Sequence, residues 1–232
     1  MAVTSEPPSP PAPPDIIAFD VVGTLFSLES LGPLVAAAGG DASTVGLWFS
    51  HLLADGFALT AAHDYQPFRE VARASLATVL PHATAAARDQ VLAGLATLDP
   101  HPDSGPALGR AVLDARVVVI TNSSTESTRK LLARGGLDAF VETIVSAEDV
   151  KRWKPASDPY AYAAATLDVP LARLGLVSVH PWDVMGARRS GLVTGWCNRR
   201  KATFPHTFGA ADVTGATLLD VVENLFGLTG TG

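Results

Sequence analysis

Ile16-Ile17-Ala18-Phe19-Asp20-Val21-Val22-Gly23-Thr24-Leu25-Phe26 is the stretch of sequence that decides the fold. An apolar run ends on a single carboxylate, and a glycine and a threonine follow it at once. The run predicts a buried strand, and the glycine predicts a tight turn after it. Ligands of open α/β sheets bind at the carboxyl ends of the strands, which places Asp20 where chemistry is expected. Position 22, where a second acid would serve as a proton donor, is Val22.

The composition is that of a globular protein and excludes several classes of partner. Of 232 residues, 47% are hydrophobic and 17% charged, and the net charge of -6 argues against nucleic-acid binding. No apolar stretch reaches the ~18 residues of a membrane span. The single cysteine, Cys197, excludes an internal disulfide and predicts a cytoplasmic protein. Residues 1–14 contain six prolines and are expected to form a disordered tail.

Strand-like and helix-like segments alternate over most of the chain, which predicts an α/β fold with a parallel sheet. The expected strands are Ile16 to Asp20, Arg116 to Asn122, Thr143 to Ser146, Leu174 to His180 and Leu192 to Cys197. The expected helices between them are Gly105 to Asp114, Ser127 to Arg134, Pro159 to Leu167 and Trp182 to Ser190.

Residues 30–99 interrupt this alternation. They are rich in alanine and leucine, show helical periodicity and contain no convincing strand, so three or four helices are expected. A helical segment inserted after the first strand of a parallel sheet predicts a cap over the strand ends. Residues 28–32 and 99–102 are the expected hinges.

Polar groups stand at the ends of several predicted strands or in the loops after them: Asp20, Thr121 with Asn122, Lys154, and Asp183 with Ser178 and His180. Each has an ordinary structural explanation. Asp20, Thr121, Asn122 or Asp183 could cap a helix, and Lys154 could be a solvated loop lysine. Their joint occurrence in this order favours a single site, because parallel strand ends converge on one cleft.

This set of motifs resembles the haloacid dehalogenase superfamily, and within it most closely the 2-haloacid dehalogenases. The resemblance rests on Asp20-x-x-Gly-Thr-Leu, on Lys154-Pro155 with Tyr160 six residues after the lysine, and on Trp182-Asp183-x-x-Gly-Ala with Asn198-Arg199 beyond it. It implies a Rossmann-like core over residues 15–29 and 100–232 and a helical cap over residues 30–99.

The resemblance also implies roles for individual residues. Asp20 would be the nucleophile, oriented by Thr24 and kept ionised by Lys154. Asp183 would position or deprotonate the hydrolytic water, with Ser178 in support and Tyr160 steadying that network. His180 stands where many relatives have an asparagine, and it is either a second base or a histidine packed against Trp182.

Further residues are expected to line the substrate site. They are Val21, Val22, Thr121, Asn122, Tyr160, Phe49 and Trp182. The dehalogenases typically carry an arginine after a Leu-Trp pair on the first cap helix, where it grips the departing halide. Here Leu47-Trp48 is followed by Phe49 instead, and Arg69 and Arg73 are the cap residues that could substitute.

Val22 bears directly on the reaction, because a halide leaves without a proton whereas an alkoxide needs an acid. The expected activity is hydrolysis of a small 2-haloacid through an ester of Asp20, without a metal or other cofactor. One alternative is a phosphatase or phosphotransferase of the same superfamily, for which Mg²⁺ would be required. The other is a catalytically weak binding protein, suggested by the missing arginine. A homodimer is compatible with the sequence but not required by it.

Overall fold

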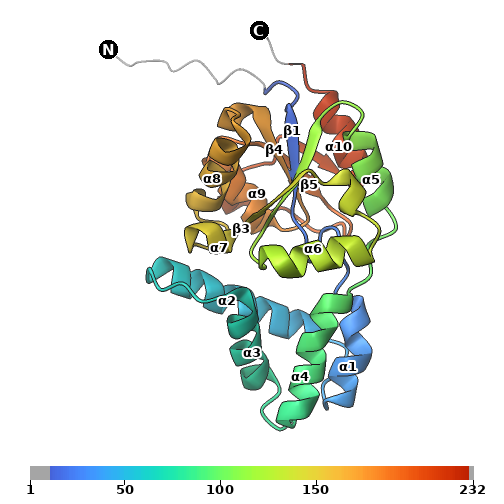
Figure 1. Cartoon of the computed structure of the whole chain (residues 1–232), viewed down its shortest axis with the longest axis vertical. Coiled ribbons are helices and arrows are strands. Elements are labelled where there is room, and N and C mark those ends of the chain that lie inside the picture. The colour runs from blue at the N-terminus through green and yellow to red at the C-terminus, as the bar shows by residue number, and fades with distance from the viewer. Residues whose placement is uncertain (1–10, 230–232) are drawn as a thin grey trace.

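The strand that begins with Ile16 lies in the middle of a six-stranded parallel sheet in the computed structural model, which describes residues 11–229 (Figure 1). The strand order is β3-β2-β1-β4-β5-β6. Phe19, the last residue of β1, pairs with Val119 on one side and Val177 on the other. The strands are β1 (Ile16–Phe19), β2 (Arg116–Thr121), β3 (Thr143–Ser146), β4 (Leu174–Ser178), β5 (Val193–Cys197) and β6 (Val213–Gly215).

The strand order reverses direction between β1 and β4, because the chain builds outward from β1 to β3 and then returns to the other side of β1. Crevices open at the carboxyl ends of the strands that flank such a switch point. Asp20 follows β1 and Asp183 lies shortly after β4, so both acids are delivered to this place.

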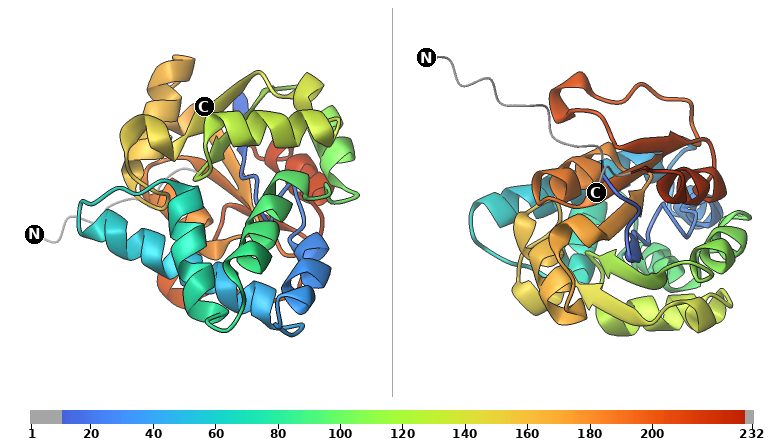
Figure 2. Two further views of the ribbon diagram at one scale, coloured as in Figure 1. Left: turned by 60° about the horizontal axis from the view of Figure 1, so that its bottom comes forward. Right: turned by 90° about the horizontal axis from the view of Figure 1, so that it is seen from above.

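Side chains alternate between the two faces of the sheet, as the geometry of a strand requires. Ile17 and Phe19 face one apolar cluster, whereas Ile16 and Ala18 face the other. Figure 2 shows helices on both sides of the sheet. The first cluster is covered by α5 (Ser104–Ala111), α6 (Thr125–Arg134) and α10 (Leu218–Phe226), and the second by α8 (Ser157–Leu167) and α9 (Pro181–Arg189).

Residues 29–97, called the helical block below, lie beyond the carboxyl ends of the strands (Figure 1). The block contains α1 (Gly32–Ala37), α2 (Thr44–Ala61), α3 (Phe68–Val79) and α4 (Ala85–Gly94), with 3-10 turns at Glu29–Leu31 and Leu95–Thr97. The longest of these helices, α2, packs against α3 through the buried ring of Trp48.

The outgoing and returning connections of the helical block are bonded to each other. The Ser27 N–H donates to the Asp99 carbonyl at 2.8 Å, and the His101 N–H donates to the Leu25 carbonyl at 2.9 Å. Between them Phe26 and Pro100 form an antiparallel bridge. The predicted hinge at 99–102 lies in this pair of segments, whereas residues 29–31 of the other predicted hinge form a 3-10 turn.

Two elements at the end of the chain are absent from the sequence prediction: β6 and α10. The four-residue helix α7 (Ala147–Val150) is a third. Most of the predicted proline-rich tail, residues 1–10, lies outside the described residues, and Pro14 at its end is buried. Within residues 11–229, none of the helices has the length and apolar character needed to cross a bilayer.

Candidate active site

Asp20 occupies the first position after β1, where the chain turns sharply. Gly23 enables the turn with φ of +87°, and a Cβ there would also lie 3.0 Å from Nε2 of His180. Thr24 is thereby brought back beside the carboxylate, and its hydroxyl donates to Oδ2 of Asp20 at 2.6 Å. The same hydroxyl oxygen accepts the Val179 N–H, which ties this turn to the end of β4.

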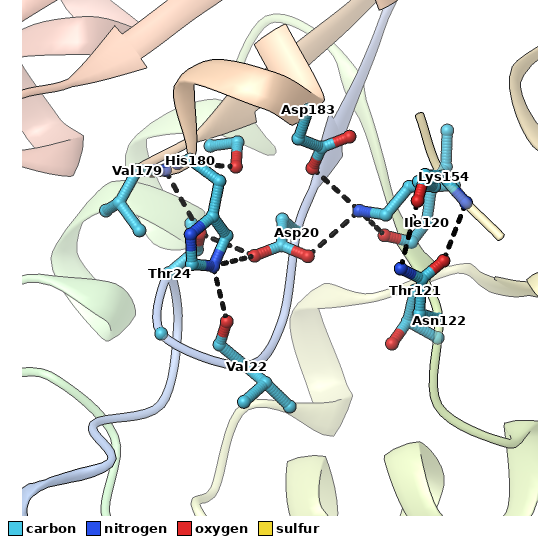
Figure 3. Close-up of polar contacts among 12 residues, drawn as sticks. Asp20, Val22, Thr24, Ile120, Thr121, Asn122, Lys154, Val179, His180 and Asp183 are labelled. Atoms are coloured by element: carbon cyan, nitrogen blue, oxygen red, sulfur yellow. Dashed lines mark hydrogen bonds and ion pairs between the residues drawn. The ribbon is translucent and has the colours of Figure 1, made fainter. Parts of the chain in front are cut away.

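Lys154 is fully buried and spends all three of its ammonium donors on fixed partners (Figure 3). Its Nζ donates to Oδ1 of Asp20 at 2.9 Å, to Oδ2 of Asp183 at 2.7 Å and to the Ile120 carbonyl at 2.8 Å. An ammonium group has three donors, so Lys154 has none left for a substrate. It is therefore a fixed cation between two carboxylates.

Burial and charge push the pKa values of the two carboxylic acids apart. Burial alone would raise the pKa of Asp20, but the charges of Lys154 and His180 and the hydrogen bonds from Thr24 and Lys154 outweigh it and lower that pKa. The pKa of Asp183 is raised, because burial and the charge of Asp20 exceed the effect of Lys154. Burial also opposes the charge on Lys154, yet the two carboxylates hold its pKa above the usual value. Asp20 is thus kept ionised, and Asp183 is the better proton acceptor.

Asp183 lies in the first turn of α9 and points inward. It is not the helix cap, because His180 occupies the N-cap position. Both of its carboxylate oxygens are engaged, Oδ2 by Lys154 and Oδ1 by the Tyr160 hydroxyl at 2.5 Å. Burial and the charge of Asp183 raise the pKa of Tyr160 well above its usual value, so this hydroxyl remains a donor. Tyr160 therefore fixes Asp183.

Asn122 holds the backbone of Lys154 rather than capping the next helix. Its Oδ1 accepts the Lys154 N–H at 2.8 Å, and its Nδ2 donates to the Lys154 carbonyl at 3.3 Å. The N-cap of α6 is Ser124, whose hydroxyl accepts the Ser127 N–H. An amide side chain offers the donor and the acceptor that a backbone unit needs, which explains the residue type at this position.

His180 lies between two aromatic rings. Its ring stacks on Trp182 with centroids 5.1 Å apart, and the Phe49 ring from α2 approaches it at 5.7 Å. Its Nε2 lies 2.9 Å from the Val22 carbonyl and 3.5 Å from Oδ2 of Asp20. A carbonyl oxygen only accepts, so Nε2 carries a hydrogen in this arrangement, and a base function would fall to Nδ1. Ser178 supports the residue by accepting the His180 N–H at 3.1 Å.

A cavity of about 20 Å³ opens beside the Asp20 carboxylate. It is lined by Asp20, Val22, Phe49, Leu53, Phe68, Thr121, Asn122, Ser123, His180 and Trp182. The sheet side of this lining is polar, and α2 and α3 of the helical block contribute the apolar side. A polar floor under an apolar wall suits a small molecule with one charged end.

Several sequence expectations about the lining are corrected by the structure. Val21 does not line the cavity, because its side chain packs into the apolar core and its carbonyl closes the turn. Tyr160 is also absent from the lining, since it is buried; its hydroxyl donates to Asp183, which agrees with the supporting role that the resemblance implies. Sequence reasoning did not assign Leu53 or Ser123 to the site. Leu53 lies one helical turn after Phe49, so the helical spacing could have identified it.

The expected halide-binding cation is also missing from this lining. The cavity is lined by no arginine within the part of the chain that the structure describes. Arg69 and Arg73, the proposed substitutes, are both exposed on α3, and Arg73 pairs with Asp89 instead. Phe49 stands in the predicted place of the arginine and presents its ring to His180.

Mg²⁺, which was expected only for a phosphatase, does not fit these residues. Mg²⁺ requires an octahedron of oxygen ligands. Here the Lys154 ammonium already lies between the carboxylates of Asp20 and Asp183 and bonds to both. Over residues 11–229, no cluster of three or more His, Cys, Asp or Glu side chains is placed to hold a metal ion.

The fold and the site together define a hydrolase with a parallel, Rossmann-like sheet, in which a strand-end aspartate is paired with a buried lysine. Residues 14–191 match the model of a protein family described as haloacid dehalogenase-like hydrolase. This chain belongs to the haloacid dehalogenase-like hydrolase family. The fold and family inferred from the sequence motifs are therefore confirmed.

Individual relatives agree with this assignment. An (S)-2-haloacid dehalogenase of Pseudomonas putida is 29% identical over 90% of this chain and 93% of its own length. A haloacetate dehalogenase of Moraxella sp. is 26% identical over 91% of this chain and 97% of its own.

The fold is also that of a solved dehalogenase. The L-2-haloacid dehalogenase from Xanthobacter autotrophicus superposes with a TM-score of 0.83 at 21% identity, covering 93% of this chain and 100% of that one. A second structure of that protein has chloropropionic acid covalently bound and superposes equally well.

Proposed function

We propose that this protein hydrolyses the carbon–halogen bond of a small 2-haloacid and releases a 2-hydroxy acid. One observation carries the proposal. The Asp20 carboxylate faces the cavity, is held ionised by Lys154 at 2.9 Å, and has an apolar Val22 where a second acid would stand. The relatives named as 2-haloacid dehalogenases support the same reaction.

In the first step, a carboxylate oxygen of Asp20 attacks the carbon that bears the halogen. A carbon–oxygen bond forms, the carbon–halogen bond breaks, and the halide departs with the bonding electrons. No proton is needed, which fits Val22. Because Lys154 and Thr24 both hold the carboxylate, it is fixed in one orientation for attack.

In the second step, water attacks the carbonyl carbon of the Asp20 ester. The proton from the water passes to Asp183, whose raised pKa makes it the acceptor of the pair. The ester bond then breaks, and the proton held by Asp183 passes to the departing alkoxide oxygen, so the product leaves as a hydroxy acid. Asp20 keeps one oxygen from the water and loses its remaining acid proton to solvent. Lys154 stays bonded to both acids in both steps, and its positive charge offsets the negative charge that remains on them.

The departing halide would lie among aromatic ring edges and the free N–H of the Asn122 amide. Phe49, Phe68 and Trp182 supply the rings in the cavity wall. The edge of an aromatic ring carries partial positive charge, so it is a weak substitute for a cation. Turnover slower than that of an arginine-bearing relative is therefore expected.

Halide release tests the proposal directly. The wild-type chain is compared with Asp20→Asn on chloroacetate, bromoacetate, fluoroacetate and 2-chloropropionate. Wild-type protein should release halide from at least one of them, and Asp20→Asn should be slower by ~10³-fold or more, because the nucleophile is lost.

Isotope incorporation tests the ester independently. After a single turnover in heavy-oxygen water, mass spectrometry should find the label in the Asp20 carboxylate rather than in the hydroxy acid. If wild-type protein releases no halide from any of these substrates, the proposed function is wrong.

A further inference from the structure

Trp153, the residue before Lys154, is held by the helical block rather than by the sheet. Its side chain is 1% exposed, and its indole N–H donates to the Gln66 carbonyl at 3.0 Å. Its backbone N–H donates to the Thr60 hydroxyl at 3.2 Å. The two preceding residues also contact the block, since Arg152 donates to His63 and the Lys151 ammonium lies 5.0 Å from the Tyr65 ring centroid.

The ring of Trp153 fits a notch between α2 and α3 that exists because residue 56 is glycine. A Cβ on Gly56 would lie 2.4 Å from Cε3 of Trp153, a distance that real Cβ atoms do not tolerate. On its other side the ring stacks on Phe68, with centroids 5.5 Å apart and the planes 22° apart. Trp153 is therefore fixed by the shape of the notch, by its indole N–H and by its backbone N–H.

Adjacent residues are thus bound to different halves of the molecule. Trp153 packs in the notch of the helical block. Lys154 is held at the sheet, where Asn122 bonds to its backbone and Asp20 and Asp183 bond to its ammonium group. A peptide unit transmits displacement directly, because consecutive Cα atoms are a fixed distance apart. A shift of Trp153 must therefore strain the contacts of Lys154.

The helices that form the notch also form the cavity wall. Phe49 and Leu53 come from α2, and Phe68 from α3 lies against both the cavity and the Trp153 ring. Because the same helices carry both features, any displacement of α2 and α3 when a substrate enters the cavity also moves the notch.

We propose that Trp153 is a positioning residue that couples the helical block to the catalytic lysine. When the ring is seated in the notch, the Lys154 ammonium group is held at hydrogen-bond distance from the Asp20 carboxylate. When the block shifts, the lysine moves and that distance changes. This inference rests on the proposed function, in which Lys154 keeps Asp20 ionised.

Three substitutions in α2 test the coupling without touching the cavity. Thr60→Val removes the hydroxyl that accepts the backbone N–H of Trp153, and Thr60→Ser retains that hydroxyl. Gly56→Ala places a methyl group where the Trp153 ring lies. The matched control is Trp48→Phe. Trp48 is equally buried on α2, but its indole N–H donates to Ala72 and Ser75 of α3. It makes no bond to residues 151–156, called the lysine segment below.

The expected result is a kinetic change, not merely a loss of stability. For Thr60→Val and Gly56→Ala, kcat should fall by about 10- to 100-fold with a smaller change in KM, since a misplacement of ~1 Å costs about that much. The acid limb of the kcat profile should move to higher pH, because the pKa of Asp20 would still be raised by burial and lowered by His180 and Thr24, but part of the lowering by Lys154 would be lost. Thr60→Ser should restore both values, and Trp48→Phe should change neither.

Hydrogen exchange separates failure of the coupling from failure of the proposed function. In Thr60→Val, amides in residues 151–156 should exchange faster than in Thr60→Ser, whereas those of β2 should not change. This readout needs no substrate, so it remains valid even if the wild-type protein releases no halide. If Thr60→Val and Gly56→Ala match Trp48→Phe in both exchange and the pH profile, the coupling does not exist.

Discussion

Lys154 is the side chain on which the charge state of both buried acids depends, so its removal makes a sharp prediction. In Lys154→Met the carboxyl groups of Asp20 and Asp183 remain buried without a counter-ion. Removing one partner of a buried ion pair costs about 3–5 kcal/mol of unfolding free energy. That cost should appear at pH 7 in urea titrations of the variant against the wild-type protein.

The dependence of this cost on pH has a definite sign. In the wild-type protein the folded pKa of Asp20 is lowered, so its contribution is present above ~3.9 and is lost as the pH falls through the folded pKa. Without Lys154, burial raises the pKa of both acids, and the folded variant loses stability as the pH rises above ~3.9. The difference between the proteins should therefore grow from pH 4.5 to pH 7.

An exposed lysine provides the control for this experiment. Lys130 pairs with Glu126 on the surface of α6, and both side chains are mostly exposed. Lys130→Met should change the unfolding free energy by less than about 1 kcal/mol at every pH, because surface ion pairs contribute little. A deficit of Lys154→Met that stays constant across the pH range would contradict the assigned charges.

The sequence could identify the charged members of the site but not all of their contacts. Asp20, Lys154 and Asp183 are recognisable because motifs surround each of them, and the structure brings them together. The bonds from Asn122 to the Lys154 backbone join residues 32 positions apart. No local pattern encodes such a bond, so only the fold reveals that this amide supports the lysine.

At the scale of the elements, α9 and the lysine segment lie unusually close. A Cβ on Gly186 would lie 2.6 Å from Cβ of Pro155 and 2.7 Å from its carbonyl oxygen. This contact explains the glycine in the Trp182-Asp183-x-x-Gly motif. In Gly186→Ala, either α9 or the segment must shift, at a cost of about 1–3 kcal/mol of unfolding free energy. Asp183 would move relative to Lys154, so kcat should fall as well.

For a second glycine, replacement by alanine should change the unfolding free energy in the opposite direction, so this glycine serves as the control. Gly46 lies in α2, and a Cβ there meets nothing within 4 Å. Gly46→Ala should stabilise the protein by up to about 1 kcal/mol, since alanine is the better helix former. Thermal denaturation of both variants checks the pair, and a neutral Gly186→Ala would show that the close contact has no consequence.

Strands were easier to predict than the last elements of the chain. Runs such as Arg116 to Asn122 are long, β-branched and buried on both faces, and the observed strands differ from the prediction at their ends. The strand β6 has only three residues at the edge of the sheet, which is too short for a periodic signal. In contrast, α10 had a detectable pattern of apolar residues and a capping box at Thr217, so it could have been found.

At the scale of the whole molecule, the helical block and the sheet share one apolar core. The cluster that contains Phe19 and Val177 of the sheet continues into Leu52 and Leu76 of the block. The block should therefore unfold together with the sheet in a single transition.

Two tryptophans can report on the two parts. Trp48 lies inside the block and Trp196 lies on β5. Because Trp153 and Trp182 also fluoresce, each signal is taken as the difference between the wild-type protein and the variant Trp48→Phe or Trp196→Phe. Both difference signals should give the same urea midpoint as far-UV circular dichroism. A Trp48 signal that is lost at lower urea than the Trp196 signal would show that the block unfolds by itself.

The bonded pair of connections between residues 25–27 and 99–101 has a consequence for modularity. Because the chain leaves and rejoins the sheet at adjacent points, the helical block is an insertion whose removal would leave two neighbouring chain ends. Folds tolerate insertions best at such places. The length and sequence of the block can therefore vary while the strand register stays fixed. The acids and the lysine would keep their chemistry, and an exchanged block would alter which molecules reach them.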